Sequence, residues 1–298
     1  MPSSEEKNWW RVYQMQIEAK NLSYVYEANT AMSVKALDDV SIRIPSGQFV
    51  GIAGHTGSGK TTLVQLLDKL LTPSSGTVLL DGEDIFSKKY DTKKLRRSVG
   101  IVFQYPEYQL FAETVIKDVS FGPKNLGLSE KEAVGNASEA LKKVGIDEAD
   151  FQLSPFELSG GQRRRAAIAG VLAMHPSILI LDEPTAGLDP QGRDEILNML
   201  KDLNKGGMTV ILVSHSMEDI ALYADRLIVL DKGKVLFDAE TKEVFSHVEK
   251  LEEIGLAAPQ VTYLMRDLKA AGLPVREDIT TADEAVAEIL RALNQRIE

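Results

Sequence analysis

A short glycine-rich stretch constrains the fold of this chain more than any other part of its sequence. Residues 54–62 are Gly-His-Thr-Gly-Ser-Gly-Lys-Thr-Thr and fit the pattern G-x-x-x-x-G-K-[ST]. The apolar run 48–53 before this stretch is typical of a buried strand, and the run 63–67 after it has helical spacing. A strand, a glycine-rich loop and a helix in this order form the setting in which the pattern binds phosphate.

The chemistry of phosphate binding explains each residue type in the loop. Glycines allow successive backbone N–H groups to turn toward one anion, and the start of a helix adds the positive end of its dipole. We expect the Lys60 ammonium to reach the terminal phosphates and the Thr61 hydroxyl to hold Mg²⁺. An ordinary Gly/Ser turn is the competing interpretation, and the flanking strand and helix argue against it. The expected phosphate-binding residues are Gly54, His55, Thr56, Gly57, Ser58, Gly59, Lys60, Thr61 and Thr62.

Composition and charge exclude several classes of protein. The 298 residues contain no cysteine, which excludes disulfides, thiolate zinc sites and cysteine nucleophiles. The four histidines show no metal-ligand spacing, and the formal net charge of -10 gives no general support for binding nucleic acid. No run approaches the roughly 18 apolar residues of a membrane span, and the N-terminus lacks the pattern of a secretory signal. We therefore expect a cytoplasmic protein that docks at a membrane only through a partner.

Apolar strand-like runs alternate with helical patterns along most of the chain. An arm of residues 1–15, which carries Trp9 and Trp10, precedes the first expected strand. From about 105 to 173 the sequence shows helical patterns and no convincing strand, so we expect a helical insert there. The alternation elsewhere predicts an α/β fold with a mostly parallel sheet and helices on both faces. Residues 236–298 are expected to form a C-terminal helical extension.

Two carboxylates end an apolar run in the second half of the chain. Residues 178–181 are Ile-Leu-Ile-Leu, and Asp182 and Glu183 follow them. A buried strand that ends in this way places its carboxylates at the edge of the sheet where open α/β folds bind ligands. We expect Asp182 to hold Mg²⁺, in part through water, and Glu183 to orient or deprotonate the water that attacks the γ-phosphate. An acidic turn is common by itself, but here the phosphate loop lies upstream.

A third motif makes the prediction more specific. Leu158-Ser159-Gly160-Gly161-Gln162 precedes a helix rich in arginine and alanine and resembles the signature loop of ABC-type ATPases. Across residues 16–235 the motifs also follow the order of that family. They are the phosphate loop, Gln104 after a strand, the signature loop, the Asp182-Glu183 strand end, Ala186-Gly187-Leu188-Asp189, and Ser214-His215. The resemblance implies a RecA-like P-loop core with an antiparallel β subdomain and a helical signature subdomain.

The resemblance also implies roles for single residues, with ATP as the nucleotide. The signature loop of one subunit would cap the γ-phosphate of the nucleotide that the opposing subunit holds. The Gln104 amide would contact Mg²⁺ and the attacking water, His215 would contact the γ-phosphate, and Asp189 would cross the dimer interface. Tyr26 matches the position at which the family stacks an aromatic ring on adenine, and Tyr24 is the alternative.

One branch of the family is the best match. Residues 104–127 and 213–219 resemble the ATPases of energy-coupling factor transporters, most of all the second of their two ATPase subunits. The resemblance implies a motor at the cytoplasmic face of the membrane that drives uptake of vitamins or other micronutrients. Its implied partners are a second ATPase subunit, a transmembrane coupling protein and, indirectly, a membrane protein that binds the substrate. Residues expected to receive a helix of the membrane partner, unless they are core, are Tyr105, Tyr108, Leu110 and Phe111.

Alternatives remain open at the level of sequence. A soluble ABC ATPase that remodels ribosomes or DNA is the second candidate function, although such chains typically carry two nucleotide domains or long inserts. The resemblance favours a paralogue over a second copy of this chain as the ATPase partner. Residues 186–189 are Ala-Gly-Leu-Asp, where the wider family most often has Ser-Ala-Leu-Asp. The aspartate is retained, so we expect this chain to hydrolyse ATP.

Overall fold

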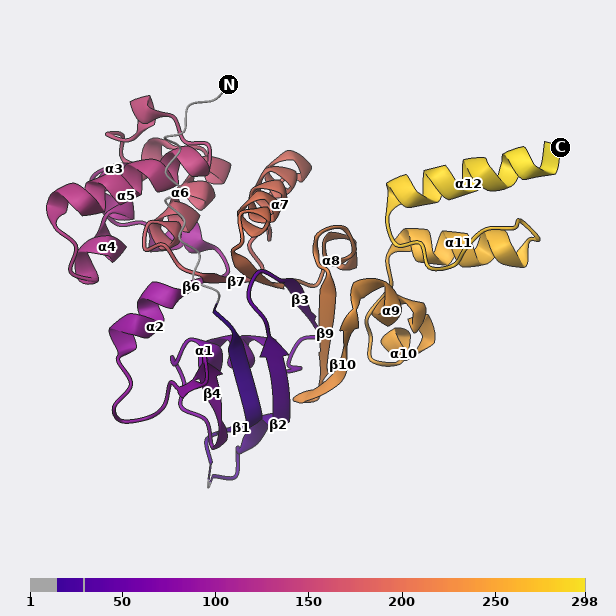
Figure 1. Ribbon diagram of the computed structural model, residues 1–298, viewed down its shortest axis with the longest axis horizontal. Coiled ribbons are helices and arrows are strands. Elements are labelled where there is room, and N and C mark those ends of the chain that lie inside the picture. The colour runs from indigo at the N-terminus through magenta and orange to yellow at the C-terminus, as the bar shows by residue number, and fades with distance from the viewer. Residues whose placement is uncertain (1–14, 29, 298) are drawn as a thin grey trace. The chain divides into compact units, whose positions relative to one another are not determined.

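The computed structural model of the protein describes residues 15–28 and 30–297, with side chains through residue 294 (Figure 1). The expected N-terminal arm with Trp9 and Trp10 lies outside the described residues, apart from Met15. The strands are β1 (Ile17–Tyr26), β2 (Val34–Ile44), β3 (Phe49–Ala53), β4 (Ser75–Leu80), β5 (Glu83–Asp84), β6 (Val99–Val102), β7 (Ile178–Asp182), β8 (Thr209–Val213), β9 (Arg226–Asp231) and β10 (Lys234–Glu240).

These strands form two sheets of different kinds. A four-stranded sheet has the order β2-β1-β4-β5, and a six-stranded sheet has the order β10-β9-β3-β8-β7-β6. β3 pairs with β9 and β6 pairs with β7 in parallel, whereas β9 with β10 and β4 with β5 are antiparallel. The predicted α/β class, with parallel and antiparallel parts, is confirmed.

The apolar runs of the sequence became the most buried strands. β3, β7 and β8 are buried at every residue, as expected for strands that are covered on both faces. Asp81 and Gly82 turn the chain from β4 into the short strand β5. A turn at residues 231–234 joins β9 to β10, and the two strands pair as an antiparallel hairpin.

Helices account for most of the remaining chain. The 3₁₀ helices are η1 (Pro106–Gln109), η2 (Glu148–Asp150) and η3 (Pro155–Glu157). The α-helices are α1 (Lys60–Leu67), α2 (Thr92–Ser98), α3 (Val115–Val119), α4 (Phe121–Asn125), α5 (Glu130–Lys143), α6 (Gly160–Leu172), α7 (Pro190–Lys205), α8 (Met217–Tyr223), α9 (Thr241–Ser246), α10 (Val248–Glu253), α11 (Gln260–Ala270) and α12 (Ala282–Ile297). Residues 105–173 contain helices and no strand, as the sequence predicted.

The chain divides into two compact units. Unit 1 contains residues 43–48 and 78–210 together with the described part of the first 18 residues. Unit 2 contains the described residues of 19–42, 49–77 and 211–298. Within unit 1, helices α3, α4, α5 and α6 pack on one another and appear as the magenta group in Figure 1.

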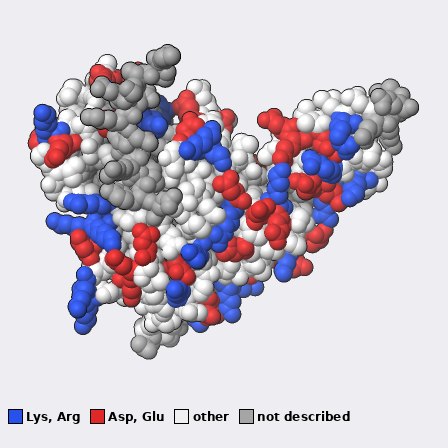
Figure 2. All heavy atoms as spheres, viewed as in Figure 1, with Lys and Arg blue, Asp and Glu red and all other residues white. Residues whose placement is uncertain are grey.

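Charge is finely mixed on the face of the molecule that Figure 2 shows. On the face shown in Figure 2, acidic and basic side chains alternate and no large area of one sign forms. The net charge of -10 is therefore not concentrated into a single field on that face. Such a surface offers no broad basic stripe of the kind that holds a nucleic-acid backbone.

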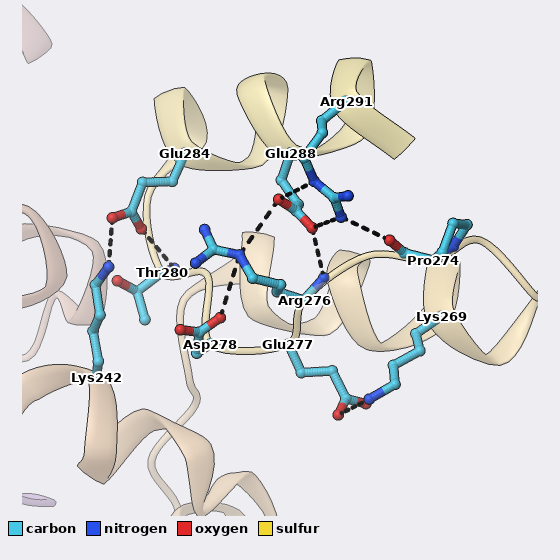
Figure 3. Close-up of polar contacts among 10 residues, drawn as sticks. All are labelled: Lys242, Lys269, Pro274, Arg276, Glu277, Asp278, Thr280, Glu284, Glu288 and Arg291. Carbon is cyan, nitrogen blue, oxygen red and sulfur yellow. Dashed lines mark hydrogen bonds and ion pairs between the residues drawn. The ribbon is translucent and has the colours of Figure 1, made fainter. Parts of the chain in front are cut away.

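The end of the chain builds a small core of its own within unit 2. Helices α11 and α12 enclose an apolar cluster of Met265, Leu273, Val275, Ile279, Ala285 and Ala292. A polar network surrounds the buried carboxylate of Glu288 in α12 (Figure 3). Arg276 and Arg291 both contact that carboxylate, and the contacts of Arg276 tie α12 to the segment between α11 and α12.

Candidate functional site

The phosphate loop joins β3 to α1 in unit 2. A Cβ atom at Gly54 would lie 2.4 Å from the carbonyl oxygen of Leu230, so no side chain fits there. A Cβ atom at Gly59 would lie 2.5 Å from the carbonyl oxygen of Ala36. Gly59 is also the N-cap of α1, with a φ of 106° and no side chain to cap the helix. The loop thus presents bare backbone at the start of a helix, as anion binding requires.

Polar groups point into the loop. The Lys60 Nζ donates to the carbonyl oxygens of Gly54 and His55, at 2.6 and 3.1 Å. The Ser58 N–H donates to the carbonyl of His55 at 3.1 Å. The Ser58 hydroxyl is buried and has no hydrogen-bond partner within the described part of the chain. An ammonium and a hydroxyl therefore lie where the sequence predicts phosphate oxygens to bind.

The turn between β9 and β10 supports the loop. The N–H of Gly233 donates to the carbonyl of Ser58 at 3.0 Å, and the N–H of Asp38 donates to the carbonyl of Gly233 at 2.8 Å. The His55 Nε2 lies 3.0 Å from Oδ1 of Asp231. The sequence analysis placed His55 in the loop but missed its carboxylate partner, because the two residues are 176 positions apart.

Tyr26 is better placed than Tyr24 for contact with a ligand. The Tyr26 hydroxyl lies 3.2 Å from the hydroxyl of Thr62 in α1, and the Tyr26 side chain is 39% exposed. The Tyr24 ring is half-buried and packs edge-on against Tyr26, with ring centroids 4.7 Å apart. The geometry favours Tyr26 as the ring that stacks on a base, which stays a prediction.

His215 follows β8 in unit 2 and is exposed. The N–H of the preceding Ser214 donates to the carbonyl of Ile52 in β3 at 3.3 Å. β3 leads directly into the phosphate loop. The segment that carries His215 therefore lies beside the strand that precedes the phosphate loop. This neighbourhood is consistent with the predicted contact of His215 with the γ-phosphate.

The residues predicted to activate water, Gln104 and Glu183, follow two neighbouring strands of unit 1 at the same edge of the sheet. β6 and β7 are parallel, and Val102 pairs with Leu181. Gln104 and Glu183 each lie two residues beyond that pair, so the parallel register starts both loops at the same edge. Asp182, the last residue of β7, is 8% exposed, whereas Gln104 is exposed.

Glu183 has an unusual backbone. Its φ is 51°, in the left-handed region that residues with a Cβ rarely adopt. Such a conformation costs about 1–3 kcal/mol and persists only where the surroundings impose it. The N–H of Ala186 donates to the carbonyl of Glu183 at 3.2 Å and closes a tight turn. Strained residues cluster at active sites, which supports the catalytic role predicted for Glu183.

The signature loop has a structural explanation of its own. Ser159 is the N-cap of α6, and its hydroxyl accepts from the N–H of Gln162 at 3.2 Å. The Gln162 side chain in turn accepts from the N–H of Ser159 at 3.0 Å, which completes a capping box. Asp189 plays a similar part for α7, because its side chain accepts from the N–H of Gly192 at 2.7 Å. Functional roles for these residues remain predictions.

Arg164 is a buried residue beside the candidate site that the sequence analysis did not single out. Its side chain is 2% exposed and donates to both carboxylate oxygens of Glu107, at 2.9 and 2.5 Å. It also donates to the carbonyls of Pro184 and Ala186, at 3.0 and 2.7 Å. Burial raises the pKa of Glu107, but hydrogen bonds and the charge of Arg164 outweigh it and hold that pKa below the ordinary value. The sequence contains one hint, because Arg164 shares a helix face with the buried Ile168.

The predicted partner surface is partly exposed and partly core. Tyr108 and Phe111 are 83% and 62% exposed, and Tyr105 is 39% exposed. Leu110 is only 8% exposed, so it supports this surface from beneath and cannot offer its side chain to a partner. Phe121, which the sequence analysis did not include, is exposed and packs edge-on against Phe111, with ring centroids 5.0 Å apart.

The residues predicted to hold Mg²⁺ fit that ion chemically. Mg²⁺ prefers oxygen ligands and keeps several of its waters. Thr61 offers an exposed hydroxyl in the first turn of α1, Asp182 a carboxylate at the end of β7, and Gln104 an amide oxygen. Each donor is of the right kind.

Comparisons with known proteins identify the family of this chain. The family model described as ABC transporter matches residues 37–186. The energy-coupling factor transporter ATP-binding protein EcfA2 of Clostridium tetani is 54% identical over 95% of this chain and 99% of its own length. EcfA2 of Clostridium perfringens is 51% identical over 94% of this chain and 100% of its own length.

Solved structures show the same similarity. The structure of cbiO1 from Clostridium perfringens, part of the ABC transporter complex cbiONQ, is 41% identical with a TM-score of 0.71, covering 85% of this chain and 100% of that one. A dimeric ATP-binding cassette in a post-hydrolysis state, bound to ADP and Pi, is 32% identical with a TM-score of 0.66 over 76% of this chain and 98% of that one.

Fold, motifs and comparisons together define an ATP-binding, ATP-hydrolysing subunit of the ABC transporter class. Within that class the chain belongs to the family of energy-coupling factor transporter ATP-binding proteins. In the described part of the chain, no helix has both the length and the apolar character needed to cross a membrane.

Proposed function

We propose that this chain is the ATP-driven motor of an importer for vitamins or other micronutrients. One observation carries the proposal above the others: a phosphate loop with Lys60 and bare glycine backbone lies in a chain that matches energy-coupling factor ATPases over nearly its whole length. The substrate itself binds to another membrane protein, so its identity is not encoded in this site. The mixed charge on the face shown in Figure 2 and the comparisons do not favour the alternative of a ribosome- or DNA-remodelling ATPase.

In this proposal each motif has one task in hydrolysis. The phosphate loop binds the phosphates, with Lys60 as a point charge on the terminal ones. Glu183 orients the attacking water or takes a proton from it. Gln104 helps to orient the same water, and His215 orients the γ-phosphate. Mg²⁺, held through Thr61, Gln104 and Asp182, would neutralise developing charge on the phosphates. These assignments rest on the motifs and on local geometry.

Hydrolysis also requires a second ATPase subunit. Ser159 and the glycines that follow it lie at the start of α6, where backbone N–H groups suit an anion. We infer that they act on the nucleotide of the opposing subunit, and that Asp189 contacts that subunit. A solved relative is a dimeric cassette, and a paralogue is the partner that the sequence favours.

Contact with the membrane complex is assigned to the exposed aromatic side chains of unit 1. Two pairs of neighbouring rings, Tyr105 with Tyr108 and Phe111 with Phe121, make up this aromatic cluster, which suits the apolar face of a short helix. A transmembrane coupling protein would supply that helix, with the substrate-binding membrane protein attached through it. The chain would then lie peripherally at the cytoplasmic face of the membrane.

Uptake by membrane vesicles that contain the complete transporter tests the motor proposal. Lys60→Ala should abolish both ATP turnover and uptake, because it removes the cation predicted to bind the terminal phosphates. Vesicles in which Lys60→Ala supports uptake at the unaltered rate would contradict the proposal.

The same vesicles test the membrane contact. Tyr108→Ala should leave nucleotide binding within about twofold of the unaltered chain, yet release the chain from the membrane and stop uptake. Met32→Ala, which removes a 76% exposed apolar side chain in unit 2, is the control and should change neither. Retention of Tyr108→Ala on the membrane with full uptake would exclude the aromatic cluster as the docking site.

A further inference from the structure

The loop after β6 and the loop after β7 are joined by a single side chain. Arg164 uses Nε and Nη2 to hold both oxygens of Glu107, and Nη1 to hold the carbonyls of Pro184 and Ala186. Glu107 belongs to η1, which begins two residues after Gln104. Pro184 directly follows Glu183. One guanidinium on the helix of the signature loop therefore contacts both loops that carry predicted water-activating residues.

Arginine is the side chain this position requires. A guanidinium presents five N–H donors in a rigid plane, and four hydrogen bonds are made here. A lysine ammonium could not span a carboxylate and two carbonyls in the same geometry. The Tyr105 ring also lies against the guanidinium, with the Arg164 Cζ 5.6 Å from the ring centroid. These contacts fix the orientation of the side chain as well as its charge.

The backbone on both sides of Arg164 needs support. Tyr105 and Glu183 both have left-handed backbone, with φ of 56° and 51°. Residues with a Cβ adopt this region only where neighbouring contacts impose it. The contacts of Arg164 fall directly beside these two residues, on Glu107 in one loop and on Pro184 and Ala186 in the other. They are therefore placed to hold both strained turns.

We infer that Arg164 is a positioning residue that sets the Glu183 carboxylate for hydrolysis and couples it to the Gln104 loop. The inference rests on the proposed function, because it assigns a task within ATP hydrolysis. The same loop carries Tyr108, which is 83% exposed on the surface proposed to meet the membrane partner. A shift of η1 when the partner moves would thus reach the loop of Glu183 through one side chain.

The test is the steady-state ATPase activity of the purified transporter complex that contains the full chain. Arg164→Lys keeps the charge but loses the planar fork, and a misplacement of about 1 Å can reduce a rate roughly a hundredfold. We expect kcat to fall by about ten- to a hundredfold while the ATP concentration at half-maximal rate changes by less than about threefold. Glu107→Gln keeps the shape of the side chain that Arg164 holds but removes its charge. We expect it to fold and to lower kcat by a smaller factor than Arg164→Lys.

Arg291→Lys is the matched control. Arg291 also holds a glutamate with two N–H groups and donates to a proline carbonyl, but in the C-terminal extension. The kcat of the complex with this control substitution should equal that of the unaltered complex at a temperature where both are folded. A folded Arg164→Lys or Glu107→Gln complex with unaltered kcat would overturn the inference. Absence of ATP turnover in the unaltered complex would contradict the proposed function instead.

Discussion

Two arginines in this chain make almost the same contacts in very different surroundings. Arg164 grips Glu107 with two N–H groups and donates to two carbonyls of the loop after β7. Arg291 grips Glu288 with two N–H groups and donates to the carbonyl of Pro274 (Figure 3). The difference lies in burial: Arg164 is 2% exposed, whereas the Arg291 side chain is 44% exposed.

This difference separates two uses of one interaction. In unit 1 the arginine is the buried member, and its spare donors reach a strained loop beside a predicted catalytic carboxylate. In the C-terminal extension the glutamate is the buried member, at 5% exposure, and the arginine covers it from the solvent side. The first arrangement fixes loops that the proposed reaction uses. The second holds α12 against the segment that precedes it.

The largest effect expected from this comparison is on stability. Arg164→Met would leave the Glu107 carboxylate and two carbonyls without their donor in a buried place, which costs about 3–5 kcal/mol of unfolding free energy. Arg291→Met would cost less, because water can reach the Glu288 carboxylate once the exposed arginine is gone. Denaturant unfolding of the purified chain measures both. Equal losses for the two variants would show that burial does not distinguish these pairs.

Replacing both members of the buried pair sharpens the same comparison. Buried ion pairs can often be exchanged for apolar side chains with little loss, or a gain, of stability. We therefore expect Arg164→Met combined with Glu107→Leu to be more stable than Arg164→Met alone. Its ATPase activity should stay low, because the carbonyls of Pro184 and Ala186 still lack their donor. Recovery of activity together with stability would reduce Arg164 to a packing element.

A smaller effect is expected on the stability of the C-terminal extension at low pH. Hydrogen bonds from Arg291 and Arg276 outweigh burial and lower the pKa of Glu288 from 4.5 to about 2. The folded chain therefore keeps this carboxylate charged at pH values where the unfolded chain has protonated it. The stabilisation is fully present above about pH 4.5 and is lost as the pH falls through 2.

Hydrogen exchange of α12 between pH 5 and pH 2.5 measures this dependence. Protection of its amides should fall with acid in the unaltered chain and fall less steeply in Glu288→Gln, which has no proton to gain. Parallel curves for the two chains would show that Glu288 does not carry the acid sensitivity of the extension.

The sequence predicted the strands and helix starts around the candidate site well, because these features are local. The phosphate loop, the signature loop and the Asp182-Glu183 strand end each depend on a few consecutive residues that set a turn or a helix start. The apolar runs 48–53 and 178–181 likewise identified strands that are buried throughout.

The parts that sequence did not predict depend on residues that are distant along the chain. Arg164 and Glu107 are 57 positions apart, and only the fold brings them together. Leu110 looked like its aromatic neighbours in the sequence, yet the chain turns it inward while Tyr108 stays exposed. An arginine in a run of three gives little indication of which one is buried, although the face shared by Arg164 and Ile168 provides a hint.

The most direct test of the account asks whether this chain uses Glu183 to hydrolyse the ATP that it binds. The complete complex is loaded with γ-labelled 8-azido-ATP, and the label crosslinked to this chain is followed over time. With Glu183→Gln the label should persist at least about a hundredfold longer than in the unaltered complex, since the general base is lost while the phosphate loop is intact. Loss of the label at the same rate in both complexes would contradict the account.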